Sequence, residues 1–179
     1  MNKFDWNLLS NSDQHTAMQF LRGFREPDLI IAPDGNPYLY RWHLTNHEEK
    51  SAKVFLHIQV SDDPERPLHD HPWDNVTVML AGGYHEIMSM SEGPPSPGST
   101  TTFIRAKGDV IYRKARFAHR LLLPNGWKYA MTLFTVGPKI REWGFWFEDG
   151  WVPFNQVTRL HGNISVHVHS ESFNPSEGM

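Results

Sequence analysis

The sequence predicts an all-β fold, either a closed β-barrel or a double-sheet jelly roll. Short stretches of alternating or continuous apolar residues recur along the chain at regular spacing. Turn residues separate these stretches, as in Asp34-Gly35-Asn36-Pro37, Lys107-Gly108 and Pro124-Asn125-Gly126. Many short strands joined by such turns are typical of barrels and jelly rolls. With 179 residues and no evident internal repeat, the chain is expected to form a single domain, 1–179.

Residues 11–25 have the periodicity of an amphipathic helix. Ser12 or Asp13 can cap its amino end, and Pro27 stops it. Its apolar face consists of Ala17, Met18, Phe20, Leu21 and Phe24. We therefore expect an N-terminal helical extension, 1–27, that packs on the outside of the barrel.

The strands are expected between residues 29 and 136. Gly82 or Gly83 is expected to close the strand that begins at Val76, and the Pro- and Gly-rich residues 92–99 to form an exposed loop. The predicted strands are 29–31, 38–44, 54–60, 76–80, 84–90, 100–105, 109–112, 119–123 and 129–136. The barrel core is accordingly placed at 38–152, with a polar tail at 160–179.

Composition excludes several classes of protein. The 17 Lys and Arg residues against 20 Asp and Glu include no basic block of the kind that binds a phosphate backbone, so nucleic acid is not an expected partner. Cysteine is absent, which leaves His, Asp and Glu as the metal-binding residues. The start of the chain lacks a continuous apolar segment, and no run of 18 apolar residues occurs. We expect a cytoplasmic protein that does not enter a membrane.

The stretch His69-Asp70-His71 carries the clearest chemical signal. Alternate side chains of an extended strand share a face, so His69 and His71 can bind one metal ion, whereas Asp70 points to the opposite face. Asp74 follows three residues later, and His119 lies downstream. Two histidines with a carboxylate, or three histidines, leave coordination positions open, as catalytic metal sites do.

These residues resemble the two motifs of the cupins, a superfamily of small jelly-roll barrels. The first motif is His-x-His, followed by a carboxylate and a strand that ends at Gly. Here it begins at His69-Asp70-His71 and ends at Gly82 or Gly83. The second runs from a Gly through a turn to a His, here from Gly108 to His119.

The second motif keeps the length of the family pattern but has Lys114 where the family usually has Pro and Arg116 where it usually has Gly. The resemblance covers roughly residues 50–150. It implies a cupin barrel of the metal-dependent type, similar to small mononuclear iron dioxygenases. The implied metal ligands are His69, His71, Asp74 and His119; without Asp74, the site resembles the all-histidine cupins typified by thiol dioxygenases.

The implied cofactor is one divalent metal ion, with Fe(II) as the leading expectation and Zn²⁺, Mn²⁺ or Ni²⁺ as alternatives. The leading function is a metal-dependent enzyme acting on a small molecule, specifically an Fe(II) dioxygenase. Two alternatives stay open: a non-catalytic metal- or ligand-binding cupin, and an isomerase or lyase that uses the ion as a Lewis acid. Because cupins often pair edge strands, we also expect a homodimer.

Substrate-binding residues are expected around the metal. Tyr84 and Arg141 are the candidate catalytic residues, Tyr84 as a phenol lining the pocket. Further candidates for contacts to a substrate carboxylate or phosphate are Arg105, Arg113 and Arg116. Trp143, Phe145 and Phe147 share one strand face and form either a pocket wall or a core stripe or subunit interface. His167 and His169 are interpreted as part of a solvated edge strand.

Overall fold

The computed structural model describes residues 3–32, 35–45, 51–63, 67–90, 99–160 and 163–166. The N-terminal elements are a 3₁₀ helix, η1 (Trp6–Leu8), and one α-helix, α1 (Asn11–Leu21). The strands that follow are β1 (Leu29–Ile31), β2 (Leu39–His43), β3 (Lys53–Gln59), β4 (Leu68–His69), β5 (Asn75–Ser89), β6 (Thr100–Ala106), β7 (Val110–Arg113), β8 (His119–Leu122), β9 (Ala130–Val136), β10 (Gly144–Phe147) and β11 (Gly150–Pro153). A second 3₁₀ helix, η2 (Phe154–Gln156), leads to β12 (Val157–Leu160) and β13 (Asn163–Val166).

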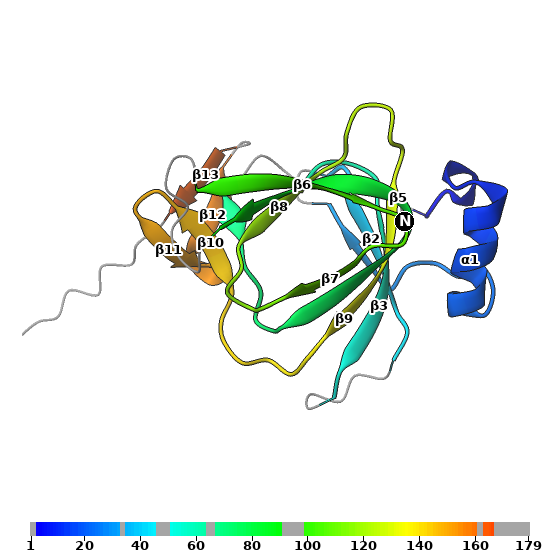
Figure 1. Cartoon of the computed structure of the whole chain (residues 1–179), viewed down its shortest axis with the longest axis horizontal. Coiled ribbons are helices and arrows are strands. Elements are labelled where there is room, and N and C mark those ends of the chain that lie inside the picture. Colours follow the sequence, from blue (N-terminus) through cyan, green and yellow to red (C-terminus); the bar gives the residue numbers. More distant parts are fainter. Residues whose placement is uncertain are drawn as a thin grey trace, which may run out of the picture.

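The strands form an antiparallel barrel around β5, as Figure 1 shows. One wall continues from β5 through β9, β3 and β2 to β1, with β7 on the other side of β5. The other wall continues from β5 through β8, β4 and β10 to β11, with β6 also paired to β5. The predicted all-β barrel architecture is confirmed.

A single long strand, β5, belongs to both walls. Residues 75–82 pair with β9, while residues 83–89 pair with β6. The prediction that Gly82 or Gly83 ends the strand is therefore wrong. Gly82 has φ +61°, and a bulge between Met79 and Ala81 precedes it, so the chain bends there and continues.

Close backbone contact requires glycine at this bend. A Cβ atom on Gly82 would lie 2.0 Å from the carbonyl oxygen of Tyr129, and one on Gly83 would lie 2.0 Å from the Trp127 ring. Gly82→Ala is expected to destabilise the fold by about 1–3 kcal/mol more than Gly108→Ala, because only the former adds a clash to the strain of positive φ. Gly108 has φ +99° with no atom near the added Cβ. Chemical denaturation of both variants tests this, and equal losses would contradict it.

Helix α1 lies outside the barrel, as predicted, but ends at Leu21 rather than near residue 25. Ser10 caps it, with its side chain accepting a hydrogen bond from the backbone N–H of Asp13. Arg22 terminates it in the left-handed conformation. The buried face of the helix packs in an apolar cluster: Phe4, Leu9, Ala17, Leu21, Trp42, Leu56, Ile58, Ala81 and Met131. This cluster lies between the helix and the outer face of one barrel wall.

Alternation along the strands therefore sends the other side chains of this wall into the barrel. Trp42, Leu56 and Ile58 face the helix, whereas Arg41 and His57, their neighbours in β2 and β3, line an internal cavity. The barrel interior is accordingly polar in part, which is suited to a binding site.

At the carboxyl end, the strand expected around residues 143–147 is present as β10, whereas the tail differs from the prediction. Residues 144–153 form the hairpin β10–β11, and β12 pairs with β13, so part of the expected tail is a two-stranded sheet. His167 and His169 lie outside the described residues. Within the described part of the chain, no helix combines the length and apolar character needed to cross a bilayer.

Candidate metal centre

Three histidines converge inside the barrel. His69 on β4 and His119 at the start of β8 are paired residues of neighbouring strands, and His71 follows β4. One ring nitrogen from each lies within 4.8 Å of the other two. The Nε2 atoms of His71 and His119 are 2.8 Å apart. Among the described residues, this is the group of His, Asp and Glu side chains whose spacing could hold a metal ion.

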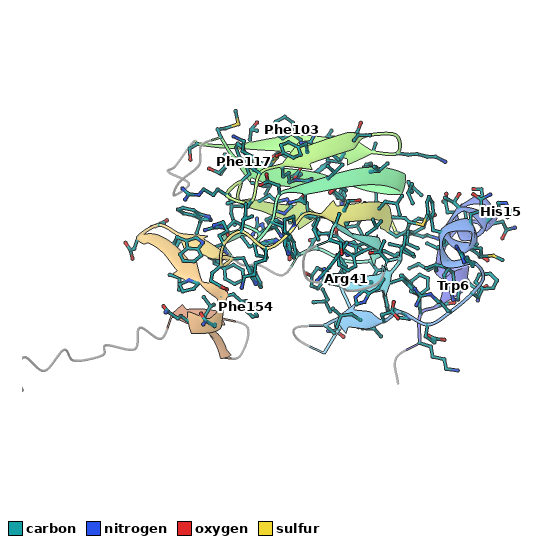
Figure 2. The ribbon with its side chains drawn as sticks, turned by 90° about the horizontal axis from the view of Figure 1, so that it is seen from below. Trp6, His15, Arg41, Phe103, Phe117 and Phe154 are labelled. Carbon is teal, nitrogen blue, oxygen red and sulfur yellow. The ribbon has the colours of Figure 1, made fainter. Side chains whose placement is uncertain are left out.

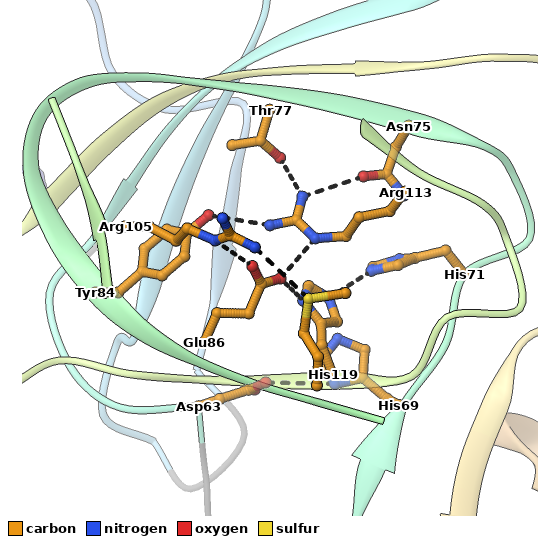
Figure 3. Close-up of polar contacts among 11 residues, drawn as sticks. Asp63, His69, His71, Asn75, Thr77, Tyr84, Glu86, Arg105, Arg113 and His119 are labelled. Atoms are coloured by element: carbon orange, nitrogen blue, oxygen red, sulfur yellow. Dashed lines mark hydrogen bonds and ion pairs between the residues drawn. The ribbon is translucent and has the colours of Figure 1, made fainter. Parts of the chain in front are cut away.

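Carboxylates lie behind two of the three imidazoles, as Figure 3 shows. Glu86 Oε1 is 2.7 Å from His119 Nδ1, and Asp63 Oδ2 is 3.3 Å from His69 Nδ1. At His119, a proton on Nδ1 shared with Glu86 leaves Nε2 with its lone pair for an ion. The donor set and its supporting carboxylates fit a divalent ion of the kind that imidazole binds, such as Fe²⁺ or Zn²⁺.

Glu86 also anchors a buried charge network. The fully buried carboxylate accepts hydrogen bonds from Arg113 Nε at 2.6 Å and Arg105 Nε at 2.8 Å. Burial raises the pKa of Glu86, but the hydrogen bond from His119 and the positive charge of Arg113 outweigh it and hold the pKa below its usual value. Glu86 is therefore an anion in the folded protein.

The guanidinium of Arg113 is enclosed by hydrogen-bond acceptors. Besides Glu86, it donates to Thr77 Oγ1 at 2.8 Å, to the Tyr84 hydroxyl at 3.4 Å and to Asn75 Oδ1 at 3.5 Å. Arg113 is thus held by protein groups on several sides, and its charge is neutralised by Glu86.

His71 is kept neutral by its surroundings. Burial lowers the pKa of His71 well below its usual value, and the charges of the neighbouring histidines and arginines lower it further. A neutral imidazole is the form that binds a metal ion. The Trp73 ring stacks on His71 with centroids 5.5 Å apart and fixes the ring plane.

The histidine cluster opens into a cavity of about 700 Å³. Such a volume is within the usual range for sites that bind small molecules. Its walls come from β1, β2, β3, β5, β8 and β9, together with the Trp143 and Phe154 rings, which stack with centroids 4.2 Å apart. The cavity is mostly apolar, with Arg41, His57 and Tyr84 among its polar lining residues.

The predicted site residues fall into two groups. His69, His71, His119 and Tyr84 line the cavity, and burial raises the pKa of Tyr84 despite the opposing effect of Arg113. Asp74 does not join the histidine cluster. Its carboxylate accepts hydrogen bonds from the Ala115 N–H at 2.8 Å and from the Tyr112 hydroxyl at 3.0 Å.

Arg141 also lies apart from the main cavity. It pairs with the buried carboxylate of Asp70, and its guanidinium lies 5.1 Å from the centre of the Trp151 ring. Arg141, Asp74 and Arg116 line a second, smaller cavity. Among the arginines that the sequence suggested as substrate contacts, Arg113 lines the main cavity, while Arg105 pairs with Glu86.

The aromatic face at residues 143, 145 and 147 is only partly a pocket wall. Trp143 lines the cavity, whereas Phe145 is buried beside His69, with ring centroids 6.3 Å apart. Phe147 is not among the lining residues.

Sequence reasoning missed Glu86, Asp63, Arg41 and His57. Glu86 shares a strand face with Tyr84, two residues before it. Since Tyr84 was expected to line the pocket, this alternation could have placed Glu86 inside the barrel as well. Asp63 lies in a polar loop, where acidic residues are common and do not by themselves indicate a site. Arg41 and His57 sit in strands whose inward face the sequence does not identify.

Comparisons with known proteins give distant structural similarities. No family model matches the chain, and no curated protein matches it. Its fold is similar to the Fe(II) form of HppE, with a TM-score of 0.49, 14% identity, and coverage of 63% of this chain and 59% of that chain. Hydroxypropylphosphonic acid epoxidase from S. wedmorenis has a TM-score of 0.45 and 14% identity over 60% of this chain and 58% of that one.

A structure from Ralstonia eutropha that carries the name of a mannose-6-phosphate isomerase has a TM-score of 0.45 and 18% identity over 60% of this chain and 91% of that one. This chain thus spans about three fifths of the length of the HppE chain. Its own strand topology is that of an antiparallel β-barrel, and its histidine cluster could hold a metal ion.

Proposed function

We propose that the protein is a mononuclear metal-dependent enzyme that acts on a small molecule inside the barrel. The observation that carries this proposal is the convergence of His69, His71 and His119 at a cavity of about 700 Å³. Three imidazole donors leave further coordination positions open, as in catalytic rather than structural sites.

The residues of the chain have distinct parts in this proposal. The three imidazoles would hold the ion, Glu86 orients the His119 ring through Nδ1, and the Asp63 carboxylate lies close to Nδ1 of His69. A bound divalent ion supplies a Lewis acid and, if it is iron, a redox centre. The apolar cavity walls exclude water from a bound substrate, and Tyr84 presents a protonated phenol whose pKa burial raises further.

Fe(II) dioxygenase activity is the specific reaction that we propose. Imidazole ligands suit iron, and open positions allow both a substrate and O₂ to approach the same ion. The same donors suit zinc and nickel, so the metal and the reaction must be determined together.

Elemental mass spectrometry of untagged protein purified without oxygen tests the proposal. About one metal ion per chain is expected, and the ion should be lost in a His69→Ala/His119→Ala variant, because two of three ligands are removed. His85→Ala serves as the matched control, since His85 lies outside the histidine cluster. Iron with substrate-dependent O₂ uptake supports the dioxygenase, whereas zinc or manganese without O₂ uptake supports Lewis-acid chemistry. Equal metal content in the parent and the double variant would overturn the metal site.

A further inference from the structure

Arg41 is a cavity-lining cation that the metal site does not use. It lies on β2, directly across from His57 on β3. Arg41 is labelled in Figure 2. Both side chains line the main cavity, whereas Trp42 on the same strand is buried against helix α1.

The contacts of Arg41 are made with neutral groups. Its Nε donates a hydrogen bond to His57 Nε2 at 2.8 Å, and its guanidinium lies 4.9 Å from the centre of the Phe55 ring. Burial keeps the pKa of His57 well below its usual value, so the histidine is neutral. No acidic side chain among the described residues forms an ion pair with Arg41.

The other cavity and core arginines differ in this respect. Arg113 and Arg105 pair with Glu86, and Arg141 pairs with Asp70. A cation taken partly out of water without a counter-charge is costly, and proteins keep such groups mainly at functional sites. Burial lowers the pKa of Arg41, yet an arginine remains charged at neutral pH.

Arg41 and the histidine cluster belong to one cavity. The His57 ring that accepts from Arg41 stacks on Phe134 with centroids 5.1 Å apart, and Phe134 lies 5.9 Å from the His71 ring. A ligand lying along Phe134 can therefore extend from the guanidinium to the histidines. Within the described residues, the Nη groups of Arg41 have no hydrogen-bond acceptor of their own, so they remain for such a ligand.

We propose that Arg41 binds an oxyanion of the substrate, a carboxylate or a phosphate or phosphonate, at the wall of the cavity formed by β2 and β3. The planar guanidinium donates two parallel hydrogen bonds to such a group. The substrate is then a small anionic molecule whose apolar portion lies on Phe134 and whose reacting portion reaches the metal. This inference rests on the proposed function for the reacting end only.

Binding of three matched probes tests the proposal: benzoate, phenylphosphonate and neutral benzamide. Isothermal titration calorimetry on the protein as purified, and again after metal removal with a chelator, should show both anions binding more tightly than benzamide. Arg41→Gln should weaken anion binding roughly tenfold or more, because a hydrogen-bonded charge is lost, and leave benzamide unchanged. Arg41→Lys should retain part of the affinity as a point charge.

Arg116→Gln is the matched control, because Arg116 is exposed and lines the second cavity. Thermal unfolding of each variant shows whether it is folded. If Arg41→Gln does not fold, the affinities of Arg41→Lys decide the test instead. The order of benzoate and phenylphosphonate affinities identifies which oxyanion the site prefers.

Two results would overturn the anion site: equal binding of benzoate and benzamide, or anion binding that Arg41→Gln leaves unchanged. If the chelator abolishes anion binding and Arg41→Gln does not, the metal itself binds the anion, and the metal proposal stands without this one. If no metal is found but anion binding depends on Arg41, the anion site stands and the proposed metal function fails.

Discussion

Glu86→Gln is expected to lower the free energy of unfolding by about 3–5 kcal/mol, because the substitution leaves Arg113 buried without its counter-charge. Arg113 is 1% exposed and Glu86 is completely buried, so water cannot replace the lost interaction. The same substitution is expected to weaken metal binding by about 10–100-fold, since the carboxylate no longer fixes the Nδ1 proton of His119.

Urea denaturation and metal competition titrations measure the two effects. Glu142→Gln makes the same chemical change at an exposed residue that pairs with Lys139, and it should alter neither quantity by much. Nitrogen-15 spectra of the imidazoles should show a changed tautomer distribution at His119. Parent-like stability of Glu86→Gln would show that Arg113 does not depend on this carboxylate.

Acid should remove the same contribution from the parent. The pKa of Glu86 is lower in the folded chain than its usual 4.5, so the unfolded chain binds the proton more readily. The stabilisation is therefore complete above about pH 4.5 and declines as the pH falls below it. In Glu86→Gln, this part of the acid dependence should be missing, which denaturation at several pH values can determine.

The three histidines could be found from the sequence because their signal is local. His69 and His71 are two residues apart on an extended segment, and His119 follows a recognisable turn. The carboxylate could not be assigned in the same way. Asp74 is near in sequence but hydrogen-bonds Ala115 and Tyr112, whereas Glu86 reaches His119 across paired strands, 33 residues apart in the chain.

The arginines show a second limit of sequence reasoning. Alternation in β2 and β3 predicts two faces but not which one points into the barrel. Here the more apolar face, with Trp42 and Leu56, packs against helix α1 on the outside of the barrel. The polar face with Arg41 and His57 therefore points inward. The order of strands is equally long-range, because β4 lies between β8 and β10. The all-β class and the outer helix, in contrast, follow from local periodicity and turns.

Asp70, between the two motif histidines, has a structural part that is separate from the metal. It is completely buried, and its carboxylate accepts hydrogen bonds from the Gly144 N–H at 2.8 Å, Trp151 Nε1 at 2.9 Å and Trp146 Nε1 at 3.1 Å. It also pairs with Arg141. The carboxylate thus joins β4 to the hairpin β10–β11 from the side opposite to His69 and His71.

Asp70→Ala is expected to cost about 3–5 kcal/mol of unfolding free energy, because several buried donors and one cation lose their acceptor together. Asp70→Asn should cost less, since one acceptor oxygen remains. Its NH₂ group, however, places a hydrogen-bond donor beside the Arg141 guanidinium, which is itself a donor. Asp149→Asn, in the exposed turn of the same hairpin, is the matched control and should remain near the parent. Denaturation midpoints measure these differences. Folded Asp70→Asn should still bind about one metal ion per chain, because the ligands come from the other face; loss of metal from folded protein would instead assign Asp70 to the metal site.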